Sequence, residues 1–202
     1  MAQIISPIPQ EIWPHFTVNF SSLRLTPEQF AQLCRDNLDL RLELTSKGEL
    51  IVMPPTGSKT GQRNFSLTSQ FGEWVRKDGT GVAFDSSTGF TLADGAIVSP
   101  DLAWIRRESW DALTEEEQES FAPICPDFVI ELRSYSDSRS RLQKKMQDYL
   151  ENGAKVGWLI DPLERQVHIY RSGRKTELLK NPETVSGEPL LPGFVLHMPE
   201  IW

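Results

Sequence analysis

The segment PDFVIELRS, residues 126–134, is the most apolar strand candidate of the chain. Because successive side chains of a strand point to opposite faces, its apolar residues at positions 128, 130 and 132 share one face. Glu131 lies on the other face together with Arg133 and interrupts a stretch that otherwise favours full burial. An isolated buried carboxylate is costly and takes up a proton instead, so Glu131 needs a partner. Arg133 is one candidate for that partner.

Outward from this strand, helical and extended patterns alternate along the chain. Ser138–Asn152 has the spacing of an amphipathic helix and is followed by Gly153, a common C-terminal cap. KVGWLIDP (residues 155–162) is the next buried strand candidate, and VHIYRSGRKTELL (residues 167–179) is a hairpin that turns at Ser172-Gly173. Upstream, the patterns predict helices at 26–34, 58–77 and 108–118, a hairpin at 41–55, and strands at 81–87, 88–95 and 96–105.

This order of elements predicts a sheet covered by helices, in the α/β or α+β class. No Pro/Gly/Ser-rich linker divides the chain, so we expect a single domain at residues 25–202, preceded by an N-terminal arm at residues 1–24. In the helix at 58–77, Phe65 and Phe71 are expected to share the apolar face. Pro100 favours an edge strand or a bulge at its position.

Composition limits the function classes. The 202 residues carry a net charge of −7, which argues against a protein that coats nucleic acid through bulk charge, because such binding neutralises phosphates. This composition does not exclude a local basic groove or a metal site built from acids. Cys34 and Cys125 form no paired motif, and the three histidines are scattered, so neither a disulfide framework nor a zinc site is expected. Without a signal segment or an apolar span, we expect a soluble cytoplasmic protein with no membrane association.

Further charged residues occupy positions that point toward Glu131. Asp101 lies in a strand candidate, on the face opposite Leu102 and Trp104. At 100° per residue, Lys145 falls on the flank of the buried face of its helix, whereas Lys144 points to solvent. Glu43, in the first strand of the predicted hairpin, adds a third acid. Acids that converge with a lysine suit metal-assisted phosphodiester hydrolysis, since carboxylate oxygens bind Mg²⁺ and a cation helps to position the nucleophile.

This arrangement resembles the PD-(D/E)XK nuclease superfamily, and within it the Uma family of proposed restriction endonucleases, which is also known as a domain of unknown function. The resemblance extends from Leu25 to Trp202 and rests on LELTSKGELIVMPPTG, TGFTLADGAIVSPDLAWI, PDFVIELRS, KKMQDYLENGAKVGWLIDP and LPGFVLHMPEIW. It implies a restriction-endonuclease-like core, with a mixed β-sheet flanked by helices. It also implies that Asp101 and Glu131 are metal-binding acids and that Glu43 is the acid of the amino-terminal region.

The sequence departs from the superfamily pattern at one position. The lysine of the motif is expected at position 133, where this chain has Arg133. Arginine keeps its proton at any working pH and cannot act as a base, although it can still orient a phosphate. Lys145, in a K-x-x-x-Y pattern with Tyr149, is the residue expected to supply the missing amine from the helix.

Other polar residues are candidates for contact with DNA. Lys59, Arg63 and Asn64, near the start of a predicted helix, are candidate contacts to the DNA backbone, although a solvated helix face is the simpler interpretation for Lys59. The preceding loop lacks the Walker spacing, so nucleotide binding there is not expected. The densest basic stretch fits either a solvated face or a groove that faces phosphates, and consists of Arg139, Arg141, Lys144 and Lys145.

Three functions follow from these patterns. The first is a DNA endonuclease in which Glu43, Asp101 and Glu131 bind Mg²⁺ or Mn²⁺ and Lys145 and Arg133 assist catalysis. The second is a nuclease-like protein that binds DNA or a protein partner without cutting. The third is an interaction protein in which Glu131 and Arg133 form an internal ion pair. We favour the first on the resemblance, with DNA as substrate; a homodimer is left open.

Overall fold

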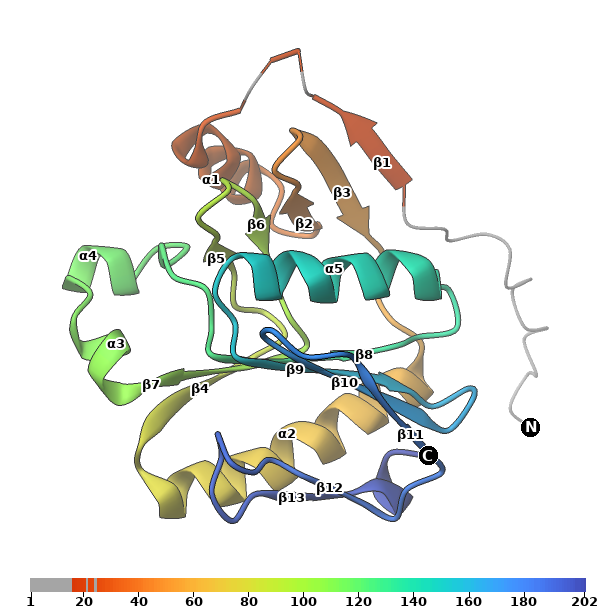
Figure 1. Ribbon diagram of the computed structural model, residues 1–202. Coiled ribbons are helices and arrows are strands. Elements are labelled where there is room, and N and C mark those ends of the chain that lie inside the picture. Colours follow the sequence, from red (N-terminus) through yellow and green to blue (C-terminus); the bar gives the residue numbers. More distant parts are fainter. Residues whose placement is uncertain (1–15, 21, 24) are drawn as a thin grey trace, which may run out of the picture.

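A six-stranded mixed β-sheet forms the centre of the molecule in this computed structural model, which describes residues 16–20, 22–23 and 25–202 (Figure 1). Its strand order is β11 (Glu177–Lys180), β10 (Gln166–Arg171), β9 (Val156–Asp161), β8 (Phe128–Leu132), β7 (Leu102–Arg106) and β4 (Gly81–Asp85). β8 and β9 are parallel, and every other neighbouring pair is antiparallel. Parallel neighbours need a crossover connection, and α5 (Arg139–Glu151) supplies it between β8 and β9.

A smaller antiparallel sheet lies next to the central one (Figure 1). Its strand order is β1 (Phe16–Asn19), β3 (Glu49–Met53), β2 (Arg41–Leu44), β6 (Ile97–Val98) and β5 (Phe90–Thr91). β2 and β3 are the hairpin expected at 41–55, and Gly48 has a φ of 76° in its turn, a conformation that favours glycine. The chain passes from this sheet to the central one between β6 and β7, through residues 99–101.

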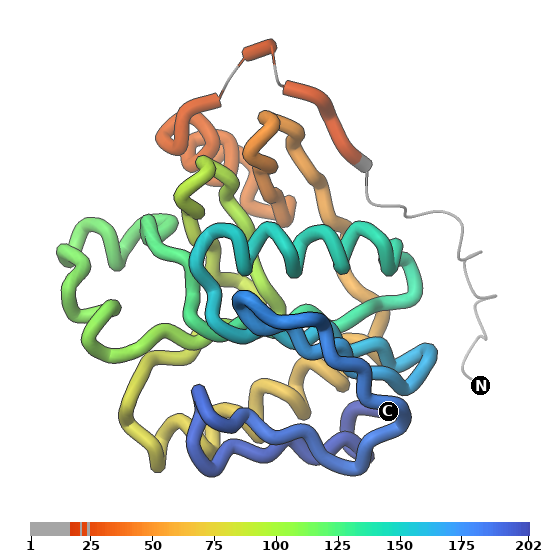
Figure 2. The backbone as a smooth tube through the Cα atoms, viewed as in Figure 1, coloured from red at the N-terminus to blue at the C-terminus, as the bar shows by residue number. Residues whose placement is uncertain are grey.

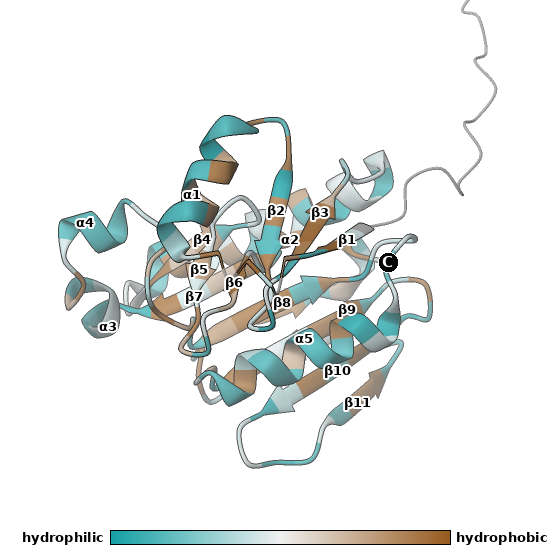
Figure 3. Cartoon of the chain, turned by 90° about the horizontal axis from the view of Figure 1, so that it is seen from above, coloured by the Kyte–Doolittle hydropathy of each residue, from teal (hydrophilic) through white to brown (hydrophobic). Residues whose placement is uncertain are grey.

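Helices cover both faces of the central sheet. α2 (Ser58–Asp78) packs Leu67 and Phe71 on the face formed by the even-numbered residues of β8, with Trp104 and Trp158 beside them. α5 packs its buried residues on the opposite face, and its outer surface is hydrophilic (Figure 3). Among the described residues, the other α-helices are α1 (Pro27–Asp36), α3 (Arg107–Asp111) and α4 (Glu115–Gln118).

The C-terminal segment lies along α2 (Figure 2). It contains the hairpin of β12 (Thr184–Ser186) and β13 (Val195–His197), followed by the short helix η2 (Met198–Glu200). The amide group of Gln70 accepts a hydrogen bond from the backbone N–H of His197 at 2.8 Å and donates one to its carbonyl at 3.2 Å. Apolar residues of this segment, such as Leu196 and Phe194, complete the core beneath α2.

Several expectations of local structure need correction. Phe65 is 74% exposed, because it lies on α2 away from the face that Leu67 and Phe71 bury against the sheet. The helix expected at 108–118 is two short helices, α3 and α4, since Thr114 caps a new helix start within it. Pro100 lies at neither an edge nor a bulge but in the connection between the two sheets.

Most of the arm predicted at residues 1–24 lies outside the described residues. Its described part includes β1, which pairs with β3 from Phe16 opposite Val52 to Asn19 opposite Glu49. In the described part of the chain, no helix has both the length and the apolar composition to cross a membrane.

Candidate active site

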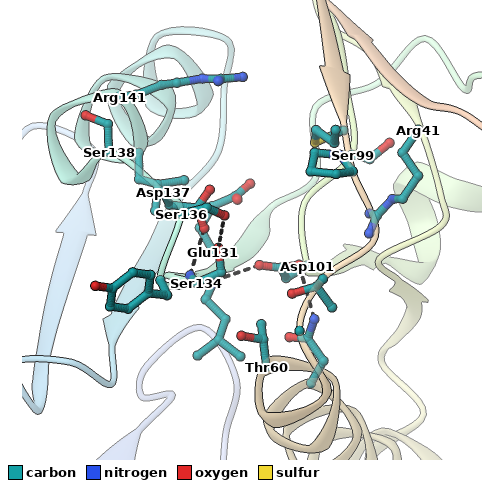
Figure 4. A pocket seen from close by; sticks show the side chains of 18 of the residues that line it. Arg41, Thr60, Ser99, Asp101, Glu131, Ser134, Ser136, Asp137, Ser138 and Arg141 are labelled. Atoms are coloured by element: carbon teal, nitrogen blue, oxygen red, sulfur yellow. Dashed lines mark hydrogen bonds between the residues drawn. The ribbon is translucent and has the colours of Figure 1, made fainter. Parts of the chain in front are cut away.

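A cleft of about 410 Å³ opens between the two sheets. The small sheet provides β2 and the segment 53–57, and the connection to the central sheet provides Ser99 and Asp101. α2, β8, the loop 134–138 and α5 complete the lining. Figure 4 shows Asp101 and Glu131 deep in this cleft, between the wall that carries Arg141 and the wall that carries Ser99 and Arg41.

Lys145 joins two acids from different sheets. Its Nζ lies 2.7 Å from Glu43 Oε1 and 2.8 Å from Glu131 Oε1, and it also donates to the carbonyl of Ser99 at 3.3 Å. The Lys145 side chain is only 17% exposed, and both carboxylates are buried. The backbone N–H of Ser99 donates a second hydrogen bond to Glu43 Oε1 at 2.9 Å. The helix flank predicted for Lys145 therefore faces the cleft, whereas Lys144 is exposed and pairs with Asp148.

Tyr149 lies one helical turn after Lys145, beneath the same acids. Its buried hydroxyl donates a hydrogen bond to Glu131 Oε1 at 2.9 Å, and Lys145 Nζ lies 5.8 Å from the centre of its ring. In the described part of the chain, both polar contacts of the Glu131 carboxyl thus reach Oε1. Within these residues Oε2 has no polar contact, and Glu131 lines the cleft. The sequence pattern K-x-x-x-Y already paired these positions, because residues four apart share a helix face.

Asp101 is held by the strand that carries Glu131. Its Oδ2 accepts a hydrogen bond from the backbone N–H of Leu132 at 2.8 Å, and Asn64 Nδ2 lies 3.5 Å from Oδ1 (Figure 4). A carboxylate offers about four lone-pair sites, so Asp101 keeps acceptor capacity beyond these contacts.

Burial and neighbouring charges shift the pKa values of the clustered acids. Burial raises the pKa of the Glu131 carboxyl to about 8, and the neighbouring Asp101 and Glu43 raise it while Lys145 opposes them. Desolvation also raises the pKa of Asp101, against the hydrogen bond from Leu132 and the charge of Lys145. Burial lowers the pKa of Lys145, but the two carboxylates together outweigh this effect and raise that pKa well above its usual range. The ammonium group therefore stays charged. A cation that enters the cleft would favour the ionised acids.

Arg133 lies outside this cluster. Its guanidinium forms an ion pair of 2.7 Å with Asp161 and donates to the carbonyl of Asp137 at 3.3 Å. The alternative interpretation, an internal ion pair between Glu131 and Arg133, is wrong, because the partner of Glu131 is Lys145. A catalytic role for Arg133 stays a prediction, and its side chain is not part of the cleft lining.

The candidate DNA contacts on α2 differ in position. Asn64 lines the cleft, whereas Lys59 is exposed outside it and Arg63 donates to the carbonyl of Ile201 at 2.9 Å. Contact of Lys59 and Arg63 with substrate stays a prediction. Arg41 also lines the cleft and was not anticipated, although it shares a face of β2 with Glu43 and this spacing of two could have indicated it.

The donor set fits a divalent cation of the Mg²⁺ type only in part. Within the described ranges, no group of three or more Asp, Glu, His or Cys side chains is arranged so that it could hold a metal ion. Glu43 is turned to Lys145 and Ser99. Asp101 and Glu131 nevertheless offer hard oxygens to the cleft, and proteins usually bind Mg²⁺ through one or two carboxylates together with water. Two carboxylates therefore fit the ion, and a role for Glu43 as a third metal ligand stays a prediction.

Comparisons with known proteins agree with this architecture. Among solved structures, four chains match, and one is the crystal structure of a "putative nuclease belonging to DUF820" from Anabaena variabilis. That chain is 24% identical, the match covers 88% of this chain and 97% of that chain, and the TM-score is 0.70, which confirms the expected nuclease-like α/β fold. No curated protein matches. The family model Uma2, described as "Putative restriction endonuclease", matches residues 27–199, so the chain belongs to the Uma2 family.

Proposed function

We propose that this protein is a metal-dependent endonuclease that hydrolyses phosphodiester bonds of DNA in the cleft between the two sheets. The family supports a nuclease, and one observation carries the finer assignment. Asp101, Glu131 and Lys145 come from three separate segments and meet in one cleft, where burial raises the pKa of both acids. Perturbed acids that converge with a cation in a cleft are typical of catalytic sites.

Each residue of the cluster has a role that its contacts support. Asp101 and Oε2 of Glu131 would hold Mg²⁺ or Mn²⁺, whose chemistry in such a site is charge neutralisation at the phosphate and activation of water. Lys145 keeps its proton, since Glu43 and Glu131 raise its pKa, so it supplies positive charge to a phosphate oxygen and does not act as a base. Glu43 holds the Lys145 ammonium at 2.7 Å and so fixes its position.

Hydrolysis is tested with a fluorescent DNA substrate and Mg²⁺ or Mn²⁺. Lys145→Met removes the charge from the cleft and should lower the cleavage rate by at least about 100-fold, an effect typical of a lost electrostatic donor. Lys144→Met is the matched control, because Lys144 is the next residue on α5 and its side chain is 66% exposed. Equal rates for the two variants would contradict the role of Lys145.

Metal binding has a second measurement that needs no activity. An ion at 100 times its dissociation constant stabilises the folded state by about 2.7 kcal/mol, which corresponds to a rise of roughly 5–10 °C in the melting temperature of a chain of this size. Asp101→Asn should abolish the rise, whereas Asp148→Asn, outside the cleft, should keep it. The absence of any metal-dependent rise in the wild type, together with DNA binding that lacks cleavage, would favour the alternative of a nuclease-like protein that binds without cutting.

A further inference from the structure

The four basic residues in the first half of α5 differ in their contacts. Arg139 contacts the ring of the buried His168 at 2.9 Å. Lys144 is exposed and forms an ion pair within its own helix, and Lys145 is bound between two buried acids. Arg141 lines the cleft, and in the described part of the chain no acid or hydrogen-bond acceptor binds its guanidinium. Of these four cations, Arg141 is therefore the one that lines the cleft without a partner in the described part of the chain, so it can contact a ligand in addition to Lys145.

Arg141 and Lys145 share one side of the helix. Residues four apart on a helix are neighbours, and one turn advances about 5.4 Å. Figure 4 shows Arg141 extending from α5 over the cleft, on the wall opposite Ser99 and Arg41. Because only one helical turn separates the two residues, Arg141 can reach a phosphate next to one that lies at Lys145.

The loop that leads from β8 to α5 exposes an aromatic ring. Tyr135 lines the cleft, follows Glu131 by only four residues, and is 68% exposed. Large exposed aromatic side chains are suited to stacking on bases, and this contact requires bases that are not already stacked in a duplex. The net charge of −7 also disfavours binding that depends on a long duplex backbone, so a short local contact to a flexible strand fits this surface better.

We propose that Tyr135 and Arg141 form a rim that binds single-stranded DNA. Arg141 contacts a phosphate beside the one that is hydrolysed, and Tyr135 stacks on a neighbouring base. This inference rests on the proposed function, because it places the scissile phosphate at Asp101, Glu131 and Lys145. It adds a substrate preference, for single strands or unpaired segments over intact duplex.

The rim is tested by binding, with cleavage removed. In an Asp101→Asn background, fluorescence anisotropy measures the affinity for a labelled 12-nucleotide single strand and for the matching duplex. We expect tighter binding of the single strand. Arg141→Ala should weaken it by at least tenfold and reduce the slope of log K against log salt by about 0.7, the value for one phosphate contact on a single strand. Tyr135→Ala should weaken it by roughly 5- to 150-fold, and Tyr135→Phe should restore it.

Lys144→Ala is the matched control, since it removes the same charge from the exposed side of α5 and should change the affinity by less than twofold. Tighter binding of the duplex, or equal losses for Lys144→Ala and Arg141→Ala, would overturn the rim. If the rim variants lose binding as expected but the wild type cuts no DNA with Mg²⁺ or Mn²⁺, the rim stands and hydrolysis fails. If the wild type cuts DNA and the rim variants bind and cut like Lys144→Ala, hydrolysis stands and the rim fails.

Discussion

At the scale of single residues, the hydroxyl of Tyr149 supports Glu131 together with Lys145. It donates to Oε1 at 2.9 Å in a buried site, and such a bond favours the ionised carboxylate. Tyr149→Phe should therefore lower the free energy of unfolding by about 1–2 kcal/mol and weaken the Mg²⁺-dependent rise in melting temperature. Urea denaturation with and without Mg²⁺ measures both effects.

The control for this prediction is Tyr170→Phe. Tyr170 is also buried in the core cluster beneath α5, but in the described part of the chain its hydroxyl makes no hydrogen bond. It should retain the metal response of the wild type. If both variants lost the metal response equally, Tyr149 would act only through packing.

The partner of Glu131 illustrates how far the sequence reaches at this scale. Helical periodicity correctly directed Lys145 inward, because that inference needs only the geometry of one helix. Strand alternation also placed Arg133 near Glu131, but it carries no information on neighbouring strands. β9 lies parallel to β8 with Leu132 opposite Ile160, so Asp161 reaches Arg133 at the strand ends and takes it away from Glu131.

At the scale of elements, the packing of α5 on β9 positions Lys145. Gly157 of β9 lies under Met146, the residue after Lys145, and a Cβ at Gly157 would come 2.2 Å from Met146 Cε and 3.3 Å from Val129 Cγ2. Met146 Cε is the free end of a flexible side chain, so Gly157→Ala should force this methyl group to move within the packed core and lower the free energy of unfolding by about 1 kcal/mol.

Gly72 provides the opposite case on α2. A Cβ there has only Arg76 Nη1 within 4 Å, at 3.8 Å, so Gly72→Ala should raise the free energy of unfolding by about 0.5–1 kcal/mol through helix propensity and leave cleavage unchanged. Chemical denaturation of both variants measures the two changes in the free energy of unfolding. Equal destabilisation by the two substitutions would show that the close packing of α5 on β9 does not determine the effect of Gly157→Ala.

The boundaries of long elements follow from local patterns, and their arrangement does not. The hairpin at β2 and β3 and the helices α2 and α5 were predictable from alternation, helical spacing and caps. Two features were not: the division into two sheets, and the β12–β13 hairpin along α2. Both depend on pairing between distant segments, such as Leu44 opposite Ile97, for which a single sequence gives no local signal.

At the scale of the whole molecule, the buried acids make stability depend on pH. Burial raises the pKa of Glu131 from its ordinary value near 4.5 to about 8. Between these values the folded protein holds a proton that the unfolded chain releases, so the free energy of unfolding falls as pH rises through this window. The slope from this one proton is at most about 1.4 kcal/mol per pH unit. Asp101, whose pKa is also raised, acts in the same direction.

A comparison between wild type and Glu131→Gln isolates this contribution. His168 acts in the opposite direction, because burial lowers its pKa and stability then rises with pH toward 6.5. This contribution is present in both proteins and cancels in their difference. We expect the wild type to lose stability from pH 6 to pH 8 relative to Glu131→Gln when no metal is added. Mg²⁺ favours the ionised carboxylate, so it should stabilise the wild type more at pH 8 than at pH 6. Urea titrations at three pH values measure both trends, and parallel pH profiles for the two proteins would show that Glu131 is ionised throughout this range.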